Sequence, residues 1–161
     1  MGLILATRQS VQRPRLQRLL QYWEQKRGGR PMPARADLDP LEFPWMLGDV
    51  SLVEVHRPGD GLRYRFRLMG SRAVERLGYD VTGKWLEDLP APDYRARLTE
   101  VFGLMVARAA PHVERPNMLI DNHVHHYEIL RLPLGRDGHQ VDMLMMAVDF
   151  TDSDNPSGMQ P

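Results

Sequence analysis

The sequence predicts a single α+β domain built on an antiparallel sheet, and three observations lead to this fold class. Predicted strands gather in two clusters, residues 49–69 and 112–150, with predicted helices before and between them. Repeating strand–helix–strand units, which would indicate a parallel sheet, are absent. The chain has 161 residues and 42% hydrophobic residues, which suits one domain with a sizeable core.

The first predicted element is an amphipathic helix within residues 10–29. Leu16, Leu19, Leu20 and Trp23 follow the i, i+3, i+4, i+7 spacing of one helical face, and two glycines end the helix. This stripe needs an apolar surface to cover. The segment 30–45 that follows contains four prolines, so we expect an ordered tether with at most one short helical turn.

The middle of the chain predicts a hairpin and then helices. Residues 49–56 are apolar and β-branched, "PGDG" predicts a turn, and residues 62–69 alternate apolar side chains with arginines. A short helix over 71–78 and a loop come next. Asp93 then begins a longer helix with one apolar stripe, formed by Leu98, Val101, Phe102, Met105 and Val106.

The last third predicts three strands. Pro116 interrupts residues 112–120, which is typical of an edge strand or a bulge. Residues 123–134 and 139–150 form a hairpin around "GRDG", and its register places Tyr127, Ile129 and Arg131 on the face of Met146. The final strand is apolar on both faces, so both faces should be covered. The middle helices cover one, and the N-terminal helix or a second subunit covers the other.

Composition excludes several classes of function. Lys+Arg and Asp+Glu both number 21, so no basic excess favours nucleic acid as a partner. The absence of cysteine excludes disulfides, thiol nucleophiles and Cys-ligated zinc, and fits a cytoplasmic protein. No apolar stretch approaches the length of a membrane span.

The chain as a whole resembles a PAS domain. The order strand–strand–helices–three strands is similar to the PAS order, and "FRLMGSRAVERLGYDVTGKWLEDL" resembles the stretch where a PAS strand enters its short helices. "PLGRDGHQVDMLMMAVDFTD" resembles the closing hairpin and its Asp-x-Thr end. "LLQYWEQKRGGRPMPARADLDPLEFP" resembles a subfamily of short bacterial PAS proteins of mostly unknown function.

The resemblance implies a stand-alone sensory domain, not an enzyme, that binds a small organic ligand and signals through a partner protein. It implies a five-stranded antiparallel sheet with helices on one face, and an N-terminal helix (1–30) before a sensor domain (31–151) and a disordered tail (152–161). It further implies a homodimer through Leu16, Leu19, Leu20 and Trp23. Thiol-flavin photochemistry needs cysteine, and haem-binding members use a histidine where residues 71–110 have none, so the resemblance disfavours flavin and haem.

The resemblance also implies a pocket between the sheet and the long helix. The aromatic and apolar residues that we expect to line it are Tyr64, Phe66, Leu68, Trp85, Phe102, Met105, Tyr127 and Met146. The competing interpretation is an ordinary filled core, and the protein would then be a ligand-free dimerisation or adaptor module.

A more distant alternative is a metal-dependent hydrolase. His123 and His125 share one face of a strand, and Asp121, His112 or Glu114 would supply the third ligand. We favour solvated imidazoles at the start of a strand and predict no metal site.

Overall fold

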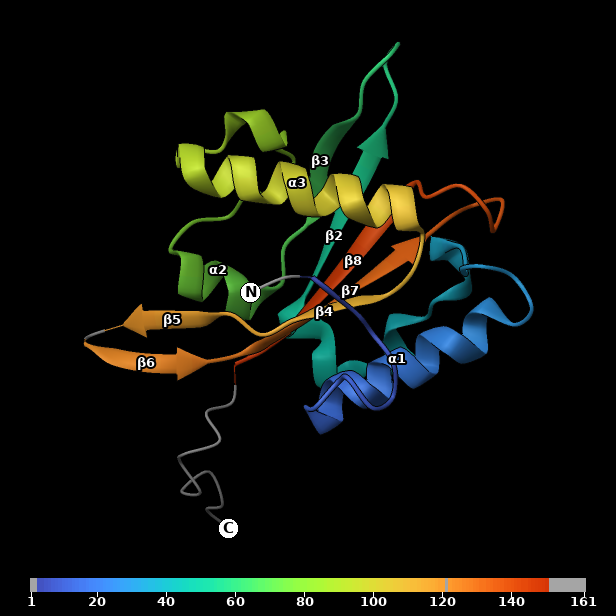
Figure 1. The fold of residues 1–161 in the computed structure, drawn as a ribbon, viewed down its shortest axis with the longest axis horizontal. Helices are drawn as coiled ribbons and strands as arrows, with labels where there is room; N and C mark the ends of the chain where they lie inside the picture. Colours follow the sequence, from blue (N-terminus) through green and yellow to red (C-terminus); the bar gives the residue numbers. More distant parts are fainter. Residues whose placement is uncertain (1–2, 121, 151–161) are drawn as a thin grey trace.

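An antiparallel sheet organises the computed structural model, which describes residues 3–120 and 122–150 (Figure 1). Within those residues the sheet has six strands in the order β1-β4-β7-β8-β2-β3, and every neighbouring pair is antiparallel. The α+β antiparallel class is confirmed, with one strand more than the five expected. The strands are β1 Ile4–Leu5, β2 Val50–His56, β3 Arg63–Leu68, β4 His112–Glu114, β7 Glu128–Leu134 and β8 Met143–Asp149.

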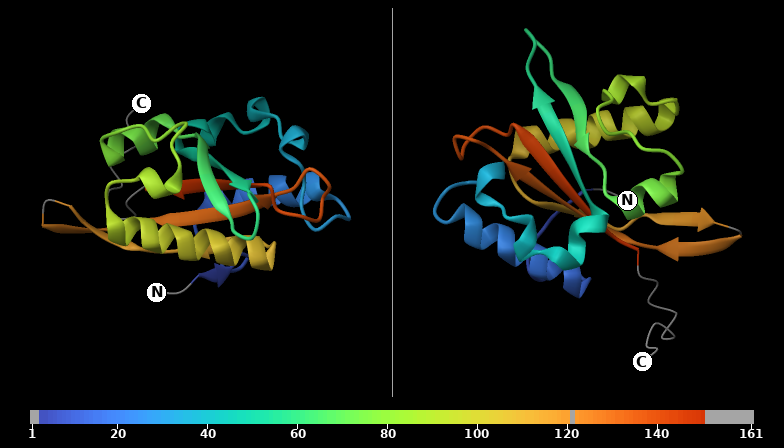
Figure 2. Two further views of the ribbon diagram at one scale, coloured as in Figure 1. Left: turned by 90° about the horizontal axis from the view of Figure 1, so that it is seen from above. Right: turned by 180° about the vertical axis from the view of Figure 1, so that it is seen from behind.

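Helices lie on both faces of this sheet, as the views from above and behind show (Figure 2). The helix α3, Pro92–Arg108, lies across one face, which we call the inner face. The helix α1, Pro14–Arg27, packs on β7 and β8 from the other side, which we call the outer face. The short helix α2, Ser71–Leu77, stands at one end of the inner face, and none of its residues is fully buried.

The hairpin register agrees with the prediction from residue spacing. Arg131 of β7 lies opposite Met146 of β8, and Leu132 lies opposite Met145. Side chains alternate between the two faces, so Arg131 and Met146 point to the inner face while Leu132 and Met145 point to α1. Met145 is 1% exposed and Leu132 is 0% exposed, which shows how closely α1 covers the outer face.

The apolar stripe of α1 is used inside the chain. Leu16, Leu19, Leu20 and Trp23 are at most 2% exposed, and the Trp23 indole Nε1 donates to the Pro133 carbonyl at 2.9 Å. The sequence left open whether this helix or a second subunit covers the outer face, and the structure places the helix there. A dimer interface was expected at these four residues. Their side chains are instead buried between α1 and the sheet, so a second subunit could contact them only if α1 moved.

The proline-rich tether has more helix than expected. It forms three short 3-10 helices, η1 Arg35–Asp37, η2 Pro40–Glu42 and η3 Pro44–Asp49, and not the single turn predicted. Prolines begin two of these turns, because their fixed φ suits the first helical position. Buried Phe43 and Met46 fix the segment against the core.

A buried carboxylate holds the residues that precede α1. Glu128 is 1% exposed, and its carboxylate accepts hydrogen bonds from the backbone N–H groups of Gln12 (3.0 Å) and Arg13 (2.9 Å). Arg115 Nε also donates to it, at 2.8 Å. Because charge-assisted bonds to a buried group are among the stronger ones, this contact fixes where α1 begins.

The chain enters α2 through a close backbone crossing at Gly70. A Cβ atom built there would lie 2.8 Å from both the carbonyl carbon of Gly48 and the carbonyl oxygen of Val50. Only glycine fits this crossing without moving backbone.

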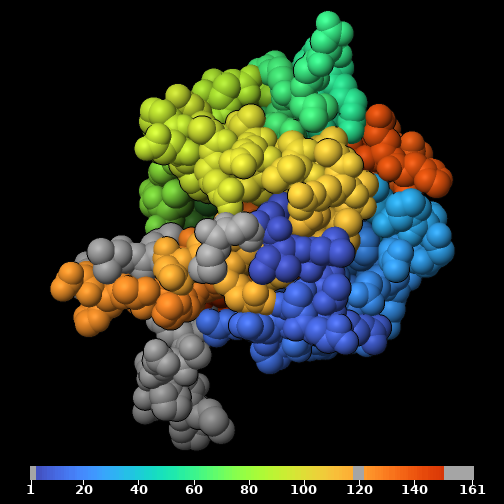
Figure 3. Space-filling model, in the orientation of Figure 1, coloured from blue at the N-terminus to red at the C-terminus, as the bar shows by residue number. Residues whose placement is uncertain are grey.

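The strand predicted over residues 123–134 is interrupted. β5, Asn117–Ile120, and β6, His123–His126, form a separate two-stranded ribbon, and the sheet strand β7 begins only after Tyr127. The ribbon extends away from the body of the domain (Figure 3). Pro116 separates β4 from β5, and β4 lies between β1 and β7 in the sheet. The edge strand or bulge expected here is instead a break between two strands.

The predicted tail, 152–161, lies outside the described residues. Within the part of the chain that is described, no helix is both long and apolar enough to cross a membrane.

Candidate functional site

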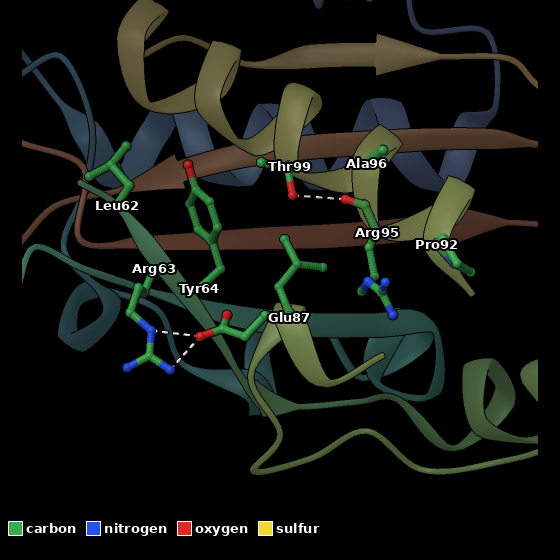
Figure 4. Close-up of a pocket in the computed structure, with 9 residues that line it drawn as sticks. Leu62, Arg63, Tyr64, Glu87, Pro92, Arg95, Ala96 and Thr99 are labelled. Atoms are coloured by element: carbon green, nitrogen blue, oxygen red, sulfur yellow. Dashed lines mark hydrogen bonds and ion pairs between the residues drawn. The ribbon is translucent and has the colours of Figure 1, made fainter. Parts of the chain in front are cut away.

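A groove of about 550 Å³ lies between β3, the 3-10 turn η4 (Leu86–Asp88) and the first half of α3 (Figure 4). Its floor is Tyr64, and its polar rim includes the ion pair between Arg63 Nε and Glu87 Oε1, 2.6 Å apart. The remaining lining residues are Leu62, Leu86, Pro92, Arg95, Ala96 and Thr99. This groove reaches only one of the eight predicted pocket residues.

Four of the predicted pocket residues pack together as core. Tyr64 and Phe66 approach Phe102 edge-on, with ring centroids 5.2 and 6.5 Å apart, and Met105 is fully buried in the same layer. These contacts have the tilted geometry that aromatic pairs prefer in a filled interior.

Two predicted pocket residues lie elsewhere. The Trp85 ring centroid is 3.9 Å from the Arg63 guanidinium carbon and 5.0 Å from the His56 ring centroid. Arg63 lies opposite His56, whereas the next pair along the two strands is Tyr64 opposite Val55. Successive side chains point to opposite faces, so Trp85 does not line the same space as Tyr64. Leu68, at the end of β3, is 47% exposed and is a surface residue here.

The last two, Tyr127 and Met146, lie on the inner face. Both are half-buried, and the Tyr127 ring stacks on Phe150 with centroids 5.1 Å apart. The guanidinium carbon of Arg76, from α2, lies 3.4 Å from the centre of the same Phe150 ring. This stack lies at the α2 end of the inner face.

Beside Met146 the inner face carries a buried ionic cluster that the sequence did not reveal as a site. Arg131 is 4% exposed, and its Nη1 donates to Glu114 Oε2 at 2.6 Å. Arg97, which α3 brings down onto the sheet, donates to the other oxygen of Glu114 at 2.6 Å. One carboxylate is therefore shared by two guanidiniums. The sequence did offer one signal for this cluster, because Arg131 is an inward-facing arginine in the otherwise apolar middle of β7.

These charges set each other's protonation. Burial alone would raise the pKa of the Glu114 carboxyl, but the Arg131 charge and the hydrogen bonds from both arginines hold this pKa below its usual range. Burial lowers the pKa of the Arg131 guanidinium, and Glu114 opposes that change. Both groups are thus ionised at neutral pH.

His112, which lies opposite Arg131 in the sheet, is held neutral. Burial lowers the pKa of this imidazole, and the nearby positive charges of Arg108 and Arg131 lower it further. Its Nδ1 is 2.8 Å from the Ala110 carbonyl oxygen, so we assign the proton to Nδ1. His112 therefore adds no charge to the cluster near pH 7.

The geometry gives no support to the hydrolase alternative. His123 and His125 lie on β6, whereas the expected third ligands His112 and Glu114 lie on β4 and bond to Ala110, Arg97 and Arg131. Asp121, the other expected ligand, lies outside the described residues. Among residues 3–120 and 122–150, no group of three or more histidine or acidic side chains gathers to hold a metal ion.

Fold and site together define an α+β domain whose main antiparallel sheet carries a helix on each face and a buried ionic cluster beneath one of them. The chain belongs to the PAS domain family, whose model matches residues 11–148 and so includes α1. PAS domains are general sensory and signalling modules. No curated protein matches the chain.

Two solved structures are similar. One is the PAS domain of BvgS from Bordetella pertussis, with a TM-score of 0.47 and 20% identity over 72% of this chain and 90% of that chain. The other is a variant of RsLOV, with a TM-score of 0.43 and 14% identity over 75% of this chain and 73% of that chain.

Proposed function

We propose that the chain is a non-enzymatic sensory PAS domain that binds a small organic ligand on its inner face and signals through a partner protein. The observation that carries this proposal is the unequal burial of the second half of β8. Met145 and Ala147, which face α1, are 1% and 0% exposed. Inward-facing Leu144 is also fully buried, but Met146 and Val148, which follow it on the inner face, are only half-buried. Apolar side chains in a central strand are normally covered, so incomplete cover on the inner face favours a ligand position there.

The loose packing of α2 accounts for this incomplete cover. None of its residues is fully buried, and it packs mainly against η3. On the same side, Ile129 of β7 is also half-buried. Ile129, Met146, Val148 and Tyr127 form an apolar wall with one hydroxyl, which is the usual character of a site for a small organic molecule.

A route from this wall to the outer face runs along β8. At its end Asp149 lies 3.9 Å from Arg15 of α1, and Arg15 also pairs with buried Asp49 at 2.8 Å. A ligand that shifts β8 would change these contacts and hence the position of α1. A surface next to α1 would then present the signal to a partner.

The ligand-free adaptor is the second candidate, and one observation favours it. Tyr64, Phe66, Phe102 and Met105 fill the interior between β3 and α3, where the pocket was expected. On this interpretation the exposed ribbon, where Val124 is 59% exposed, would be the contact surface.

Native mass spectrometry of freshly purified protein separates the two candidates, because it reports bound mass and subunit number together. A sensor predicts a retained small molecule, or a rise in melting temperature with some members of a panel of small organic compounds. A bare chain that no compound stabilises would contradict the sensor and favour the adaptor.

A further inference from the structure

Arg131 has a buried hydrogen-bond donor without a partner. Its Nη1 is used by Glu114, but its Nε is fully buried and meets no acceptor among the described residues. Buried N–H groups are nearly always paired, and an unpaired one on a charged group is costly. An unpaired donor on a side chain that is 4% exposed therefore calls for an acceptor from outside the described residues.

The one buried carboxylate near this donor does not belong to Arg131 alone. Arg131 and Arg97 share the single carboxylate of Glu114. The Arg97 side chain is 40% exposed and also lies 3.8 Å from Glu100, so solvent and that pair balance part of its charge. Because a guanidinium makes its stronger hydrogen bonds to anions, the missing acceptor is expected to carry a negative charge.

Two tyrosines stand within electrostatic range of the cluster. Burial raises the pKa of Tyr127, and the charges of Glu114 and Arg131 act on it in opposite directions. Burial likewise raises the pKa of Tyr94, on the first turn of α3, while the charge of Arg131 lowers it. Both hydroxyls therefore stay protonated at neutral pH and add no charge to the cluster, although Tyr94 is itself 44% exposed.

The side chains next to Arg131 are apolar. Met146 lies directly opposite it on β8, and Ile129 is two residues away on the same face. A guanidinium with one unused donor beside an apolar wall suits a molecule that has one carboxylate and a hydrocarbon body. A phosphate ester would bring a second negative charge, for which the single unused Nε donor offers no partner.

We propose that the inner face around Arg131 binds a small monocarboxylic acid. Its carboxylate accepts from Arg131 Nε, and its hydrocarbon part lies against Met146 and Ile129. This inference rests on the proposed sensory function and names the ligand class for the same site.

Matched pairs of acid and amide test the ligand class on the wild-type chain. Benzoate and hexanoate are compared with benzamide and hexanamide, which keep the shape and lose the charge. At about a tenfold excess over Kd, a bound acid is expected to raise the melting temperature by roughly 3–6 °C. The amides should have no effect. Equal shifts from acid and amide, or an equal or larger shift from phenyl phosphate, would overturn the carboxylate assignment.

A variant pair tests the role of Arg131. Arg131→Lys keeps the charge opposite Glu114 but removes the planar fork and the Nε donor, so affinity for the acid should fall at least about tenfold. The control is Arg115→Lys, which alters a comparable ion pair with Glu128 on the outer face and should leave affinity unchanged. Equal affinity in the Arg131 variant and the wild type would contradict the inference.

Arg131→Lys can lower stability, so a second variant gives an independent answer. Glu114→Gln removes the resident carboxylate and leaves both arginines unneutralised, and the acid should then stabilise this variant more than the wild type. No acid-dependent gain would overturn the inference. If neutral compounds bind while acids do not, the carboxylate inference fails and the sensory proposal stands. If no compound binds and native mass spectra show a bare chain, both fail.

Discussion

Replacing Leu19 by alanine tests whether α1 belongs to the folded monomer. Leu19 is fully buried between α1 and the sheet. Truncating a fully buried leucine to alanine costs about 2–5 kcal/mol, because apolar surface is lost and a cavity is left. For a domain of this size, about 3 kcal/mol corresponds to a fall in melting temperature of roughly 6–12 °C.

Thermal unfolding measured over a wide range of protein concentration is the assay. Because the contact lies within one chain, the fall should be independent of concentration. Gln21→Ala, on the exposed side of the same helix, is the control and should change the melting temperature little. The reasoning would be refuted if Leu19→Ala left stability unchanged, or if its effect disappeared on dilution together with a dimer.

Three further changes test other parts of the structure. Glu128→Gln should lower the free energy of unfolding by about 3 kcal/mol or more, since it breaks a buried ion pair, and hydrogen exchange should speed up at residues 11–13. His112 is neutral in the folded state, whereas the unfolded chain takes up its proton below about pH 6.5, so stability should fall as pH falls below that value. Urea unfolding of His112→Gln should show a weaker decline there than the wild type or the control His139→Gln, and parallel curves would count against a neutral His112. Gly70→Ala should destabilise by about 1–3 kcal/mol through backbone clashes, while Gly29→Ala, where nothing lies within 4 Å, should not. Equal melting temperatures for the two glycine variants would contradict the close backbone contact described at Gly70.

Much of the fold was predictable because it depends on local periodicity. Strict alternation along β3 predicted that Tyr64 and Phe66 are buried, and the parity of the β7–β8 hairpin placed Arg131 on the same face as Met146. The stripe of α3 likewise predicted which of its side chains are buried, including Phe102 and Met105. These patterns need no knowledge of distant residues.

Features that depend on distant pairing were not predictable. β1 is only two residues long and both are exposed, so its pairing with β4 leaves no pattern in the sequence. The break after His126 was missed because "HVHHYEIL" alternates acceptably as one strand. The buried position of Arg131 depends on Glu114 and Arg97, which lie 17 and 34 positions away along the chain. Burial of a charge is decided by such partners and not by its neighbours in sequence.

The most direct test of the central claim, that the inner face beneath α3 is the sensory site, is NMR mapping with the compound that most raises the melting temperature. Amide shifts should concentrate at residues 94–97, 129–131 and 144–148, and the side-chain Nε–H signal of Arg131 should move with them. Shifts confined to the groove beside Tyr64, or to the outer face along α1, would contradict the claim.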